Sequence, residues 1–330
     1  MPYVFGGSSG GGGGQLPTIA FFGSQTWTPT YDVTAKVFVI GGGGGGGSSS
    51  GHNDRAATGG GAGGCAISEL TFSSGTAYTI TVGAGGDGAL TNGTASAGSA
   101  SSLSGSGIST MTANGGSAGV GTGAVAAGGA GGSASGGTIA NFTGGAGGSA
   151  AANNTCSGGG SVGLWQTGNA APAASLGSHG GKMGGSLNFD TDTYAATVEF
   201  NGIHPSAGST INYAGIPTLS PFPDLRVDER EYRTTGGYQT GEDRGFVTPR
   251  GAGMPTGFYS YGHYSSANYY HISGPFGGGT GAGPHTTPAV AGRGSLGGGG
   301  GGAFTTSSLH GAFGGHGGDG GVLIFPSSIG

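Results

Sequence analysis

Segment 257–271, GFYSYGHYSSANYYH, carries the side chains best suited to recognising another molecule. Five tyrosines and two histidines stand there among Gly, Ser and Asn: Tyr259, Tyr261, His263, Tyr264, Tyr269, Tyr270 and His271. Tyrosine gives a large amphipathic contact at low rotamer cost, and Ser, Gly and Asn adapt their hydrogen bonds to a partner. A tyrosine face also stacks on sugars, with a hydroxyl at its edge. These seven residues are candidate receptor contacts; the alternative is that the rings form the core of their own segment.

Three short motifs resemble parts of catalytic sites without the context that the chemistry needs. Gly115–Gly119 matches GxSxG, but a nucleophile elbow requires a preceding strand, a following helix and His and Asp partners. Segment 180–182 ends like a phosphate-binding loop, but Met183 replaces the Ser or Thr that would bind magnesium. The acidic residues of 190–199 lie too close in sequence to predict the separated carboxylates of a glycosidase. We therefore expect no enzymatic activity, no catalytic residues and no cofactor.

The eight histidines have no metal-ligand spacing on a helix, so no metal site is predicted, although one assembled from distant histidines stays open. Segment 224–233 is the most charged part of the chain. We interpret it as a solvated loop whose charges pair with one another, with a contact surface or cation site as the alternative.

Glycine dominates the composition, with 88 of 330 positions, whereas charged residues make up only 7%. Nine basic residues cannot form the basic stripe that nucleic-acid binding requires, so no nucleic-acid partner is expected. The apolar runs Val37–Ile40 and Val322–Phe325 are far shorter than the about 20 residues that span a membrane, and no Sec signal peptide is visible. Irregular glycine blocks also exclude collagen, which needs glycine at every third position.

Such a composition is typical of disordered chains, but the low charge and the 9% aromatic content argue for order. Helix is disfavoured by about 1 kcal/mol for each glycine relative to alanine. The remaining extended conformation is polyproline II, whose backbone groups must bond to neighbouring strands. We predict a mostly irregular and β protein with little or no α-helix: a bundle of polyproline-II (polyglycine-II) strands closed by short β-strands, with an aromatic-rich insertion.

Four regions follow from the pattern along the chain. Residues 1–40 read as an aromatic β segment for attachment, and 41–181 as the glycine-rich bundle, with a second β-like stretch at 65–83. Residues 182–290 hold most of the later aromatic side chains and read as an insertion. Residues 291–330 return through glycine blocks to a closing strand at 322–325, which we expect to pair with 37–40.

Three landmarks connect the chain to a known family: TWTPTYDVTAKVFVIGGGGGGG (26–47), YTITVGAGG (78–86) and GGHGGDGGVLIF (314–325). Together with the glycine blocks between them, they resemble the glycine-rich domain of phage tail-fibre and adhesin proteins. The resemblance covers most of 20–181 and 277–325. It implies stacked polyglycine-II strands with aromatic loops at a tip. The long insertion departs from the family pattern, so its receptor role rests on analogy.

The sequence and the resemblance together predict a non-enzymatic phage tail-fibre adhesin. Its rigid stalk would present aromatic loops to a bacterial surface receptor, either protein or glycan, at the tip of a virion fibre. Residues 1–40 would contact other tail-fibre or virion proteins. The alternative is a self-assembling virion or extracellular filament subunit without a receptor role. The receptor's identity, the choice between monomer, homo-oligomer and filament, and the pairing of Cys65 with Cys156 are left open by the sequence.

Overall fold

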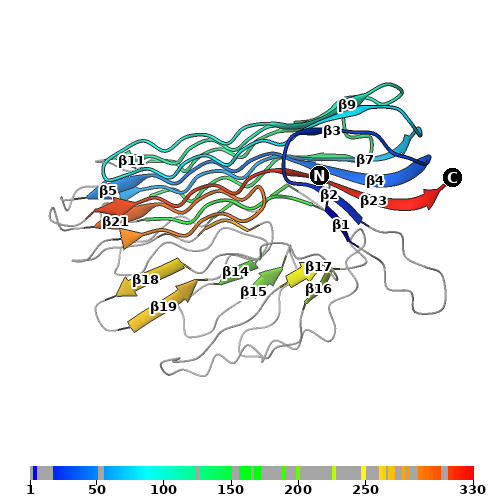
Figure 1. The fold of residues 1–330 in the computed structure, drawn as a ribbon. Coiled ribbons are helices and arrows are strands. Elements are labelled where there is room, and N and C mark those ends of the chain that lie inside the picture. Colours follow the sequence, from blue (N-terminus) through cyan, green and yellow to red (C-terminus); the bar gives the residue numbers. More distant parts are fainter. Residues whose placement is uncertain are drawn as a thin grey trace.

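The computed structural model describes residues 18–50, 56–122, 126–150, 156–164, 277–279, 291–305 and 311–330, a few single positions, and the backbones of several short strands between them. These residues form β-strands and extended segments. The described part is elongated, with β-sheets at one end and nearly parallel extended segments running away from them (Figure 1). It contains no helix of the length and apolar character needed to cross a membrane.

Two antiparallel sheets face each other at one end of the molecule. The six-stranded sheet has the order β1 (Tyr3–Phe5), β2 (Thr18–Phe21), β23 (Gly321–Ile329), β4 (Val33–Ile40), β7 (Cys65–Phe72) and β13 (Ala140–Phe142). The five-stranded sheet has the order β12 (Ala134–Ser135), β10 (Met111–Ala113), β9 (Ser101–Gly105), β8 (Tyr78–Thr81) and β3 (Gln25–Trp27).

The expected closing pair of strands is confirmed. β23 lies antiparallel to β4, with Val322 opposite Val39 and Ile324 opposite Val37. The two ends of the glycine-rich region therefore meet in the middle of one sheet. The β-like stretch predicted at 65–83 is present as β7 and β8.

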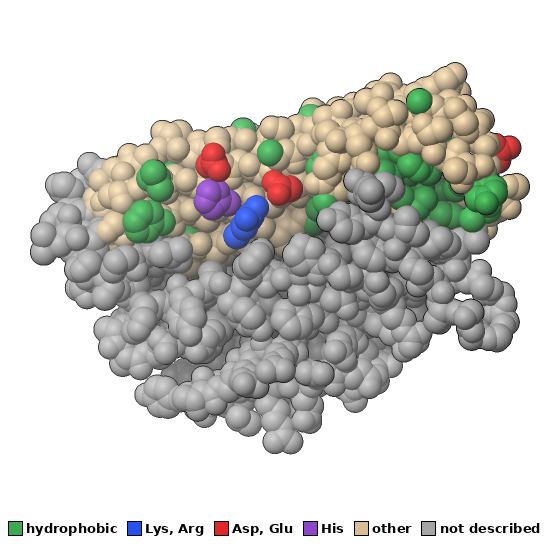
Figure 2. Space-filling model, in the orientation of Figure 1, with side chains coloured by type: hydrophobic (Ala, Val, Ile, Leu, Met, Phe, Trp, Pro, Cys, Tyr) green, Lys and Arg blue, Asp and Glu red, His purple; other side chains and the backbone are tan. Residues whose placement is uncertain are grey.

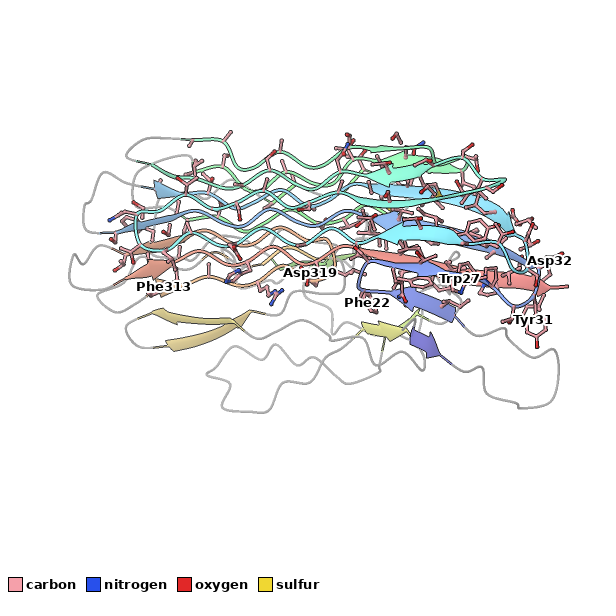
Figure 3. All side chains as sticks on the ribbon, turned by 45° about the horizontal axis from the view of Figure 1, so that its top comes forward. Phe22, Trp27, Tyr31, Asp32, Phe313 and Asp319 are labelled. Carbon is pink, nitrogen blue, oxygen red and sulfur yellow. The ribbon has the colours of Figure 1, made fainter. Side chains whose placement is uncertain are left out.

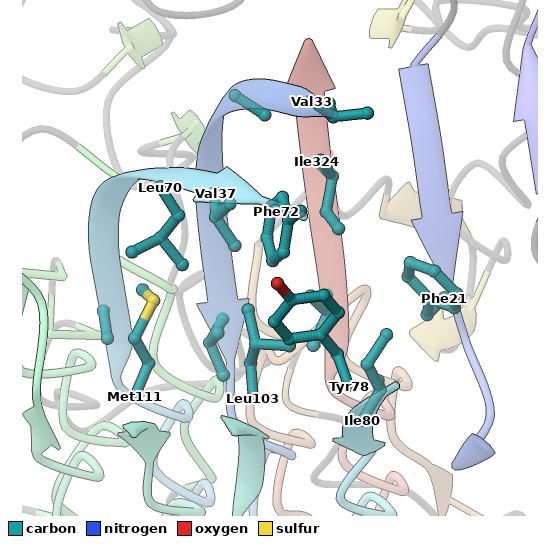
Figure 4. Close-up of a cluster of buried hydrophobic side chains, with 14 of the residues drawn as sticks. Phe21, Val33, Val37, Leu70, Phe72, Tyr78, Ile80, Leu103, Met111 and Ile324 are labelled. Atoms are coloured by element: carbon teal, nitrogen blue, oxygen red, sulfur yellow. The ribbon is translucent and has the colours of Figure 1, made fainter. Parts of the chain in front are cut away.

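A conventional hydrophobic core fills the space between the two sheets (Figure 4). Alternation places one side of each strand in this core, as in β8, where Tyr78 and Ile80 are buried and the threonines beside them are exposed. Phe72 lies edge-to-face against Trp27 at 5.0 Å and against Tyr78 at 4.9 Å between ring centroids. The Tyr78 hydroxyl accepts a hydrogen bond from the Ser73 amide at 2.9 Å, so the phenol oxygen is satisfied at the edge of the core.

The sheet strands run directly into extended glycine-rich segments, which together we call the glycine bundle: 41–47, 58–64, 83–90, 95–100, 113–120, 126–133, 144–150, 156–162, 277–279, 291–302 and 313–320. Segment 41–47 continues β4, and segment 58–64 leads into β7. The sandwich therefore fixes where the segments that continue its strands begin.

Hydrogen bonds along segment 41–47 repeat with a period of three residues. Its amides donate to segment 58–64 from residues 41, 44 and 47, to segment 96–99 from 42 and 45, and to segment 315–318 from 43 and 46. Its carbonyls accept from segments 116–119, 86–89 and 300–303 in the same rotation. Three residues per turn is the period of polyproline II, so the bundle has the predicted polyglycine-II architecture.

Segment 41–47 thus has six neighbours in a closed ring: 83–89, 95–99, 114–119, 58–64, 297–303 and 314–318. Adjacent members bond to one another as well, for example Gly60 to Gly300 at 2.9 Å and Gly318 to Gly298 at 2.8 Å. Each main-chain bond contributes only about 0.5–1.5 kcal/mol net. Losing any one of these hydrogen bonds would leave a buried amide without a partner. The bundle is therefore rigid because every interior amide is bonded.

Glycine is required inside the bundle because the segments approach too closely for a side chain. A Cβ built on Gly44 would lie 2.1 Å from the carbonyl oxygen of Ser117, and one on Gly46 would lie 2.0 Å from that of Gly301. The interior segments 41–47, 58–64 and 297–302 contain the long glycine runs and are buried throughout. Ala62 is the exception within Gly59–Gly64, and it packs in an apolar cluster with Ile40 and Val162 where the bundle joins the sheet.

Several outer segments, among them 83–90, 126–133 and 313–320, carry an exposed side chain at every third position (Figure 3). In segment 83–90, Ala84, Asp87 and Leu90 are exposed, whereas Gly83 and Gly86 are buried. In polyproline II, residues i and i+3 lie on the same side of the strand. A glycine-glycine-X repeat therefore marks an outer segment.

The remaining strands are short pairs. Beyond the bundle, β5 (Ser48–Ser50) pairs with β21 (Ala303–Thr305), β6 (Ala56–Ala57) with β11 (Gly121–Thr122), and β20 (Ala289–Val290) with β22 (Ala312–Phe313). Within the predicted insertion, β14 (Leu187–Phe189) pairs with β15 (Val198–Phe200), β16 (Leu225–Val227) with β17 (Val247–Pro249), and β18 (Ser260–Tyr264) with β19 (Ala267–His271). Most of 182–290 lies outside the described residues, so the division into four regions stays a prediction.

Cys65 and Cys156 are both buried and form no disulfide. Cys156 is bridged to Ala57, and Cys65 lies eight residues further along that same segment. At about 3.1 Å per residue, the two positions are roughly 25 Å apart along the bundle, far beyond the reach of a disulfide. The question left open by the sequence is therefore answered: the two cysteines are not paired with each other.

Burial raises the pKa of the Cys65 thiol. We expect neither thiol to react with a thiol-exchange reagent while the protein is folded, and both to react in guanidinium chloride, because the thiolate is the nucleophile. In the unfolded protein the Cys65 thiol ionises at its ordinary pKa of 9.0, whereas in the folded protein it stays protonated. The free energy of unfolding therefore falls as the pH rises above 9.0. Fast labelling of the native protein at neutral pH would contradict this.

Candidate functional site

The structure places six of the seven predicted receptor contacts on one β-hairpin. Tyr261, His263 and Tyr264 are on β18, and Tyr269, Tyr270 and His271 are on β19. The backbone register sets Tyr261 opposite Tyr270 and Ser260 opposite His271. The pairing brings these residues together along two adjacent strands, while Tyr259 lies outside the described residues. Whether the rings form a core or a contact surface stays open.

The GxSxG match is a segment of the bundle. Ser117 donates its amide to the carbonyl of Ala130 at 2.8 Å and accepts from the amide of Gly61 at 2.9 Å. Its surroundings are extended segments, not the strand–turn–helix of a nucleophile elbow. Among the described residues no three His, Cys, Asp or Glu side chains are grouped closely enough to hold a metal ion. The phosphate-loop match and the charged run 224–233 lie mainly outside the described residues.

The turn 90–94 lies at the bundle end away from the sandwich, beside β5. Asn92 has a positive φ of 56° and is held to β5, since its Oδ1 accepts from the Ser50 amide at 2.9 Å and its Nδ2 donates to the Ser50 hydroxyl at 3.0 Å.

One outer surface of the bundle combines charged, aromatic and aliphatic side chains. We call it the ladder face: the outward side of segments 83–90, 313–320 and 291–296, which lie side by side. The amides of Gly314 and Gly317 donate to segment 83–90, and the carbonyls of Phe313, His316 and Asp319 accept from segment 291–297 at 2.8–2.9 Å. Phe313, His316 and Asp319 face solvent at every third position.

Ionisable groups on the ladder face form pairs across neighbouring segments. His316 Nδ1 lies 3.2 Å from Asp87 Oδ1, and Arg293 Nη2 lies 3.8 Å from Asp319 Oδ2. Asp319 Oδ1 also accepts from the amide of Gly85 at 2.8 Å, which orients that carboxylate. Exposure of the four side chains ranges from 46% to 86%, so water screens both pairs and each contributes little to stability.

The ladder face holds every charged or histidine side chain among the described residues of the bundle: Asp87, Arg293, His316 and Asp319. Figure 2 shows acidic, basic and histidine side chains together on this face, with hydrophobic side chains nearby. Sequence reasoning missed it. The signal was GAFGGHGGDGG at 311–321, whose three larger residues are three positions apart and therefore share one side of the strand.

Comparisons with known proteins agree with this architecture. The family model described as "Glycine-rich domain" matches residues 18–325. That range begins with β2 and ends within β23, so it encloses the glycine bundle and all of the sandwich except β1 and the last residues of β23. No curated protein sequence matches the chain.

Proposed function

The chain belongs to the glycine-rich domain family, and from that membership and the structure of the bundle we propose that it is a phage tail-fibre adhesin. It attaches the virion to a receptor on the bacterial surface and catalyses no reaction. The phage context comes from the three landmarks at 26–47, 78–86 and 314–325.

The observation that carries the proposal is the saturated hydrogen bonding of the interior segments. Each amide of 41–47 is bonded to a neighbouring segment at 2.8–3.0 Å, so the bundle has few conformations to lose when its end contacts a receptor. A preorganised scaffold keeps more of the interaction free energy as affinity. Several copies on a particle would multiply weak contacts through avidity.

The arrangement of the ends also supports an adhesin. The C-terminus lies at the sandwich end (Figure 1), whereas the turn 90–94 lies at the opposite end of the bundle. A protein mounted on a virion through one end and touching a cell through the other needs this separation. Residues 1–40 would bind other tail-fibre or virion proteins, either as a single chain or as a homo-oligomer.

Receptor contact is assigned to the hairpin of β18 and β19 within segment 257–271. We expect the double substitution Tyr261→Ser/Tyr270→Ser, which changes one cross-strand pair, to reduce binding of the purified protein to host cells by at least about tenfold. Deletion of 257–271 should abolish binding. Adsorption is measured by pull-down of labelled protein with host cells and by competition with intact phage.

Tyr31→Ser is the matched control, because Tyr31 is 61% exposed and lies at the sandwich end, away from the proposed contact (Figure 3). It should bind host cells like the unmodified protein. Unchanged adsorption after both the double substitution and the deletion would overturn the assignment to this hairpin. Failure of the unmodified protein to bind any host cell or to compete with phage would overturn the adhesin function itself.

A filament subunit is the alternative, and the described sheet edges give it little support. β3 and β13 have three residues each and β12 has two. β2 pairs with β23 only at Val322–Ile324, and beyond that point β23 contains Pro326 and a register shift between Pro326 and Ser328, which are features that prevent another chain from adding to an edge. Negative-stain images decide between the two: filaments favour self-assembly, and a few copies at a fibre tip favour the adhesin.

A further inference from the structure

We propose that the ladder face is a carbohydrate-binding surface that takes an extended bacterial surface glycan along the axis of the bundle. This inference rests on the proposed function, because it names a receptor class for an adhesin. It concerns a different surface from the β18–β19 hairpin, so the two can be tested separately.

Two apolar side chains, Phe313 and Leu90, form one end of the ladder face, which we call the apolar step. Phe313 is 38% exposed and Leu90 is 71% exposed, on neighbouring segments joined by the bond from the Gly314 amide to the Ala89 carbonyl. The Phe313 ring lies over Gly311, where an added Cβ would be 2.8 Å from its Cζ, so glycine leaves the space that the ring occupies. A partly exposed aromatic ring offers apolar surface to the C–H groups of a pyranose.

Hydrogen-bond donors and acceptors continue from this apolar step along the same strands. The carboxylates of Asp87 and Asp319 accept hydrogen bonds. The guanidinium of Arg293 has five N–H groups that donate, and Asp319 lies beside one end of that guanidinium. His316 lies between the apolar step and Asp319 on its own strand. Glycan hydroxyls both donate and accept, so a surface that alternates carboxylate, imidazole and guanidinium groups can bond to several hydroxyls at once.

The spacing of these groups is fixed by the main chain. Residues three apart in polyproline II are about 9 Å apart along the strand, which is close to the length of two pyranose rings in an extended glycan. Phe313, His316 and Asp319 therefore repeat at a distance suited to a disaccharide unit. Because the backbones beneath them are bonded on both sides, little backbone order is lost on binding.

The same surface is poorly suited to a protein partner. Phe313 and Leu90 are its only large exposed apolar side chains among the described residues. A stable protein interface buries at least about 1,000 Å² around an apolar centre enriched in aromatic residues. A flat surface with one ring and several exposed polar groups matches a polyhydroxylated chain better.

The test uses the full-length protein on an array of purified bacterial lipopolysaccharides and capsular polysaccharides. We expect binding to a subset of these glycans, reduced about tenfold by Phe313→Ala and by Asp87→Asn. The control is Val120→Ala, because Val120 is also an exposed side chain of the bundle but lies on segment 113–120, across segment 41–47 from 313–320. It should bind like the unmodified protein. Thermal unfolding of each variant verifies that the bundle is intact.

Two results would overturn the glycan proposal: no binding to any arrayed glycan, or binding that Phe313→Ala and Asp87→Asn leave unchanged. Treating the cells with periodate destroys glycans, and treating them with protease destroys proteins. If the unmodified protein still bound periodate-treated cells better than these variants, but bound protease-treated cells no better than they do, the ligand would be a protein and the glycan proposal would be overturned. The adhesin function would survive each of these results if the unmodified protein still binds host cells and the hairpin variants do not.

Discussion

Gly44→Ala is expected to lower the free energy of unfolding by about 3 kcal/mol or more, at the upper end of the cost of overpacking a core. Its Cβ would lie 2.1 Å from the Ser117 carbonyl oxygen and 2.5 Å from the carbonyl carbon. Both are backbone atoms whose segment is bonded to further neighbours, so they cannot move aside locally. Thermal or denaturant unfolding measures the effect, with a fall in Tm of roughly 5–10 °C.

Two matched variants separate overpacking from a general effect of alanine. Nothing lies within 4 Å of a Cβ built on Gly23, so Gly23→Ala should leave the midpoint nearly unchanged. Ser117→Ala shortens a side chain that already faces solvent and should also be close to neutral. If Gly44→Ala were as stable as these two, the close approach of the interior segments would be wrong.

Phe72→Ala is expected to cost about 3–5 kcal/mol, the usual range for deleting a buried aromatic ring. Phe72 is fully buried and contacts Trp27 and Tyr78 edge-to-face. Its strand, β7, continues segment 58–64, which is interior to the bundle. We therefore expect the sandwich and the bundle to lose stability together, in one transition followed by near-ultraviolet circular dichroism and by hydrogen exchange of the glycine amides.

Ile329→Ala serves as the control for that experiment, because Ile329 is also on a sheet strand but is 44% exposed. Its midpoint should change by much less than that of Phe72→Ala. Glycine amides that stay protected from exchange after the aromatic core has melted would mean that the bundle is stable without the sandwich. That outcome would contradict the expected coupling.

The architecture could be predicted from the sequence because glycine leaves few alternatives. The helix penalty and the need to satisfy every amide together favour polyglycine II, and the two four-residue apolar runs identify β4 and β23 as partners. The sequence did not indicate that the main conventional core of the described residues lies between the two sheets. Strands such as β9 and β10 contribute one or two apolar residues each, which is too few to recognise within Gly/Ser/Thr-rich stretches.

The long glycine runs of the sequence mark the interior segments of the bundle, but they were not recognised as interior from the sequence alone. Gly41–Gly47 and Gly297–Gly302 are uninterrupted because no position on them faces solvent. The order of neighbours around them could not be predicted, since main-chain bonds between glycines carry no side-chain specificity. The ladder face was beyond reach for the same reason: Asp87 and His316 are more than 200 positions apart and become neighbours only through that order.

The three-residue rotation of bonding partners also constrains how such a gene can change in length. Deleting one residue from segment 41–47 would turn the rest of the strand by about 120° and offer every remaining amide to the wrong neighbour. Deleting three would shorten the strand by one full turn and keep each amide aimed as before. Viable relatives of this protein should therefore differ in their glycine tracts by multiples of three residues, with matching changes in the adjoining tracts.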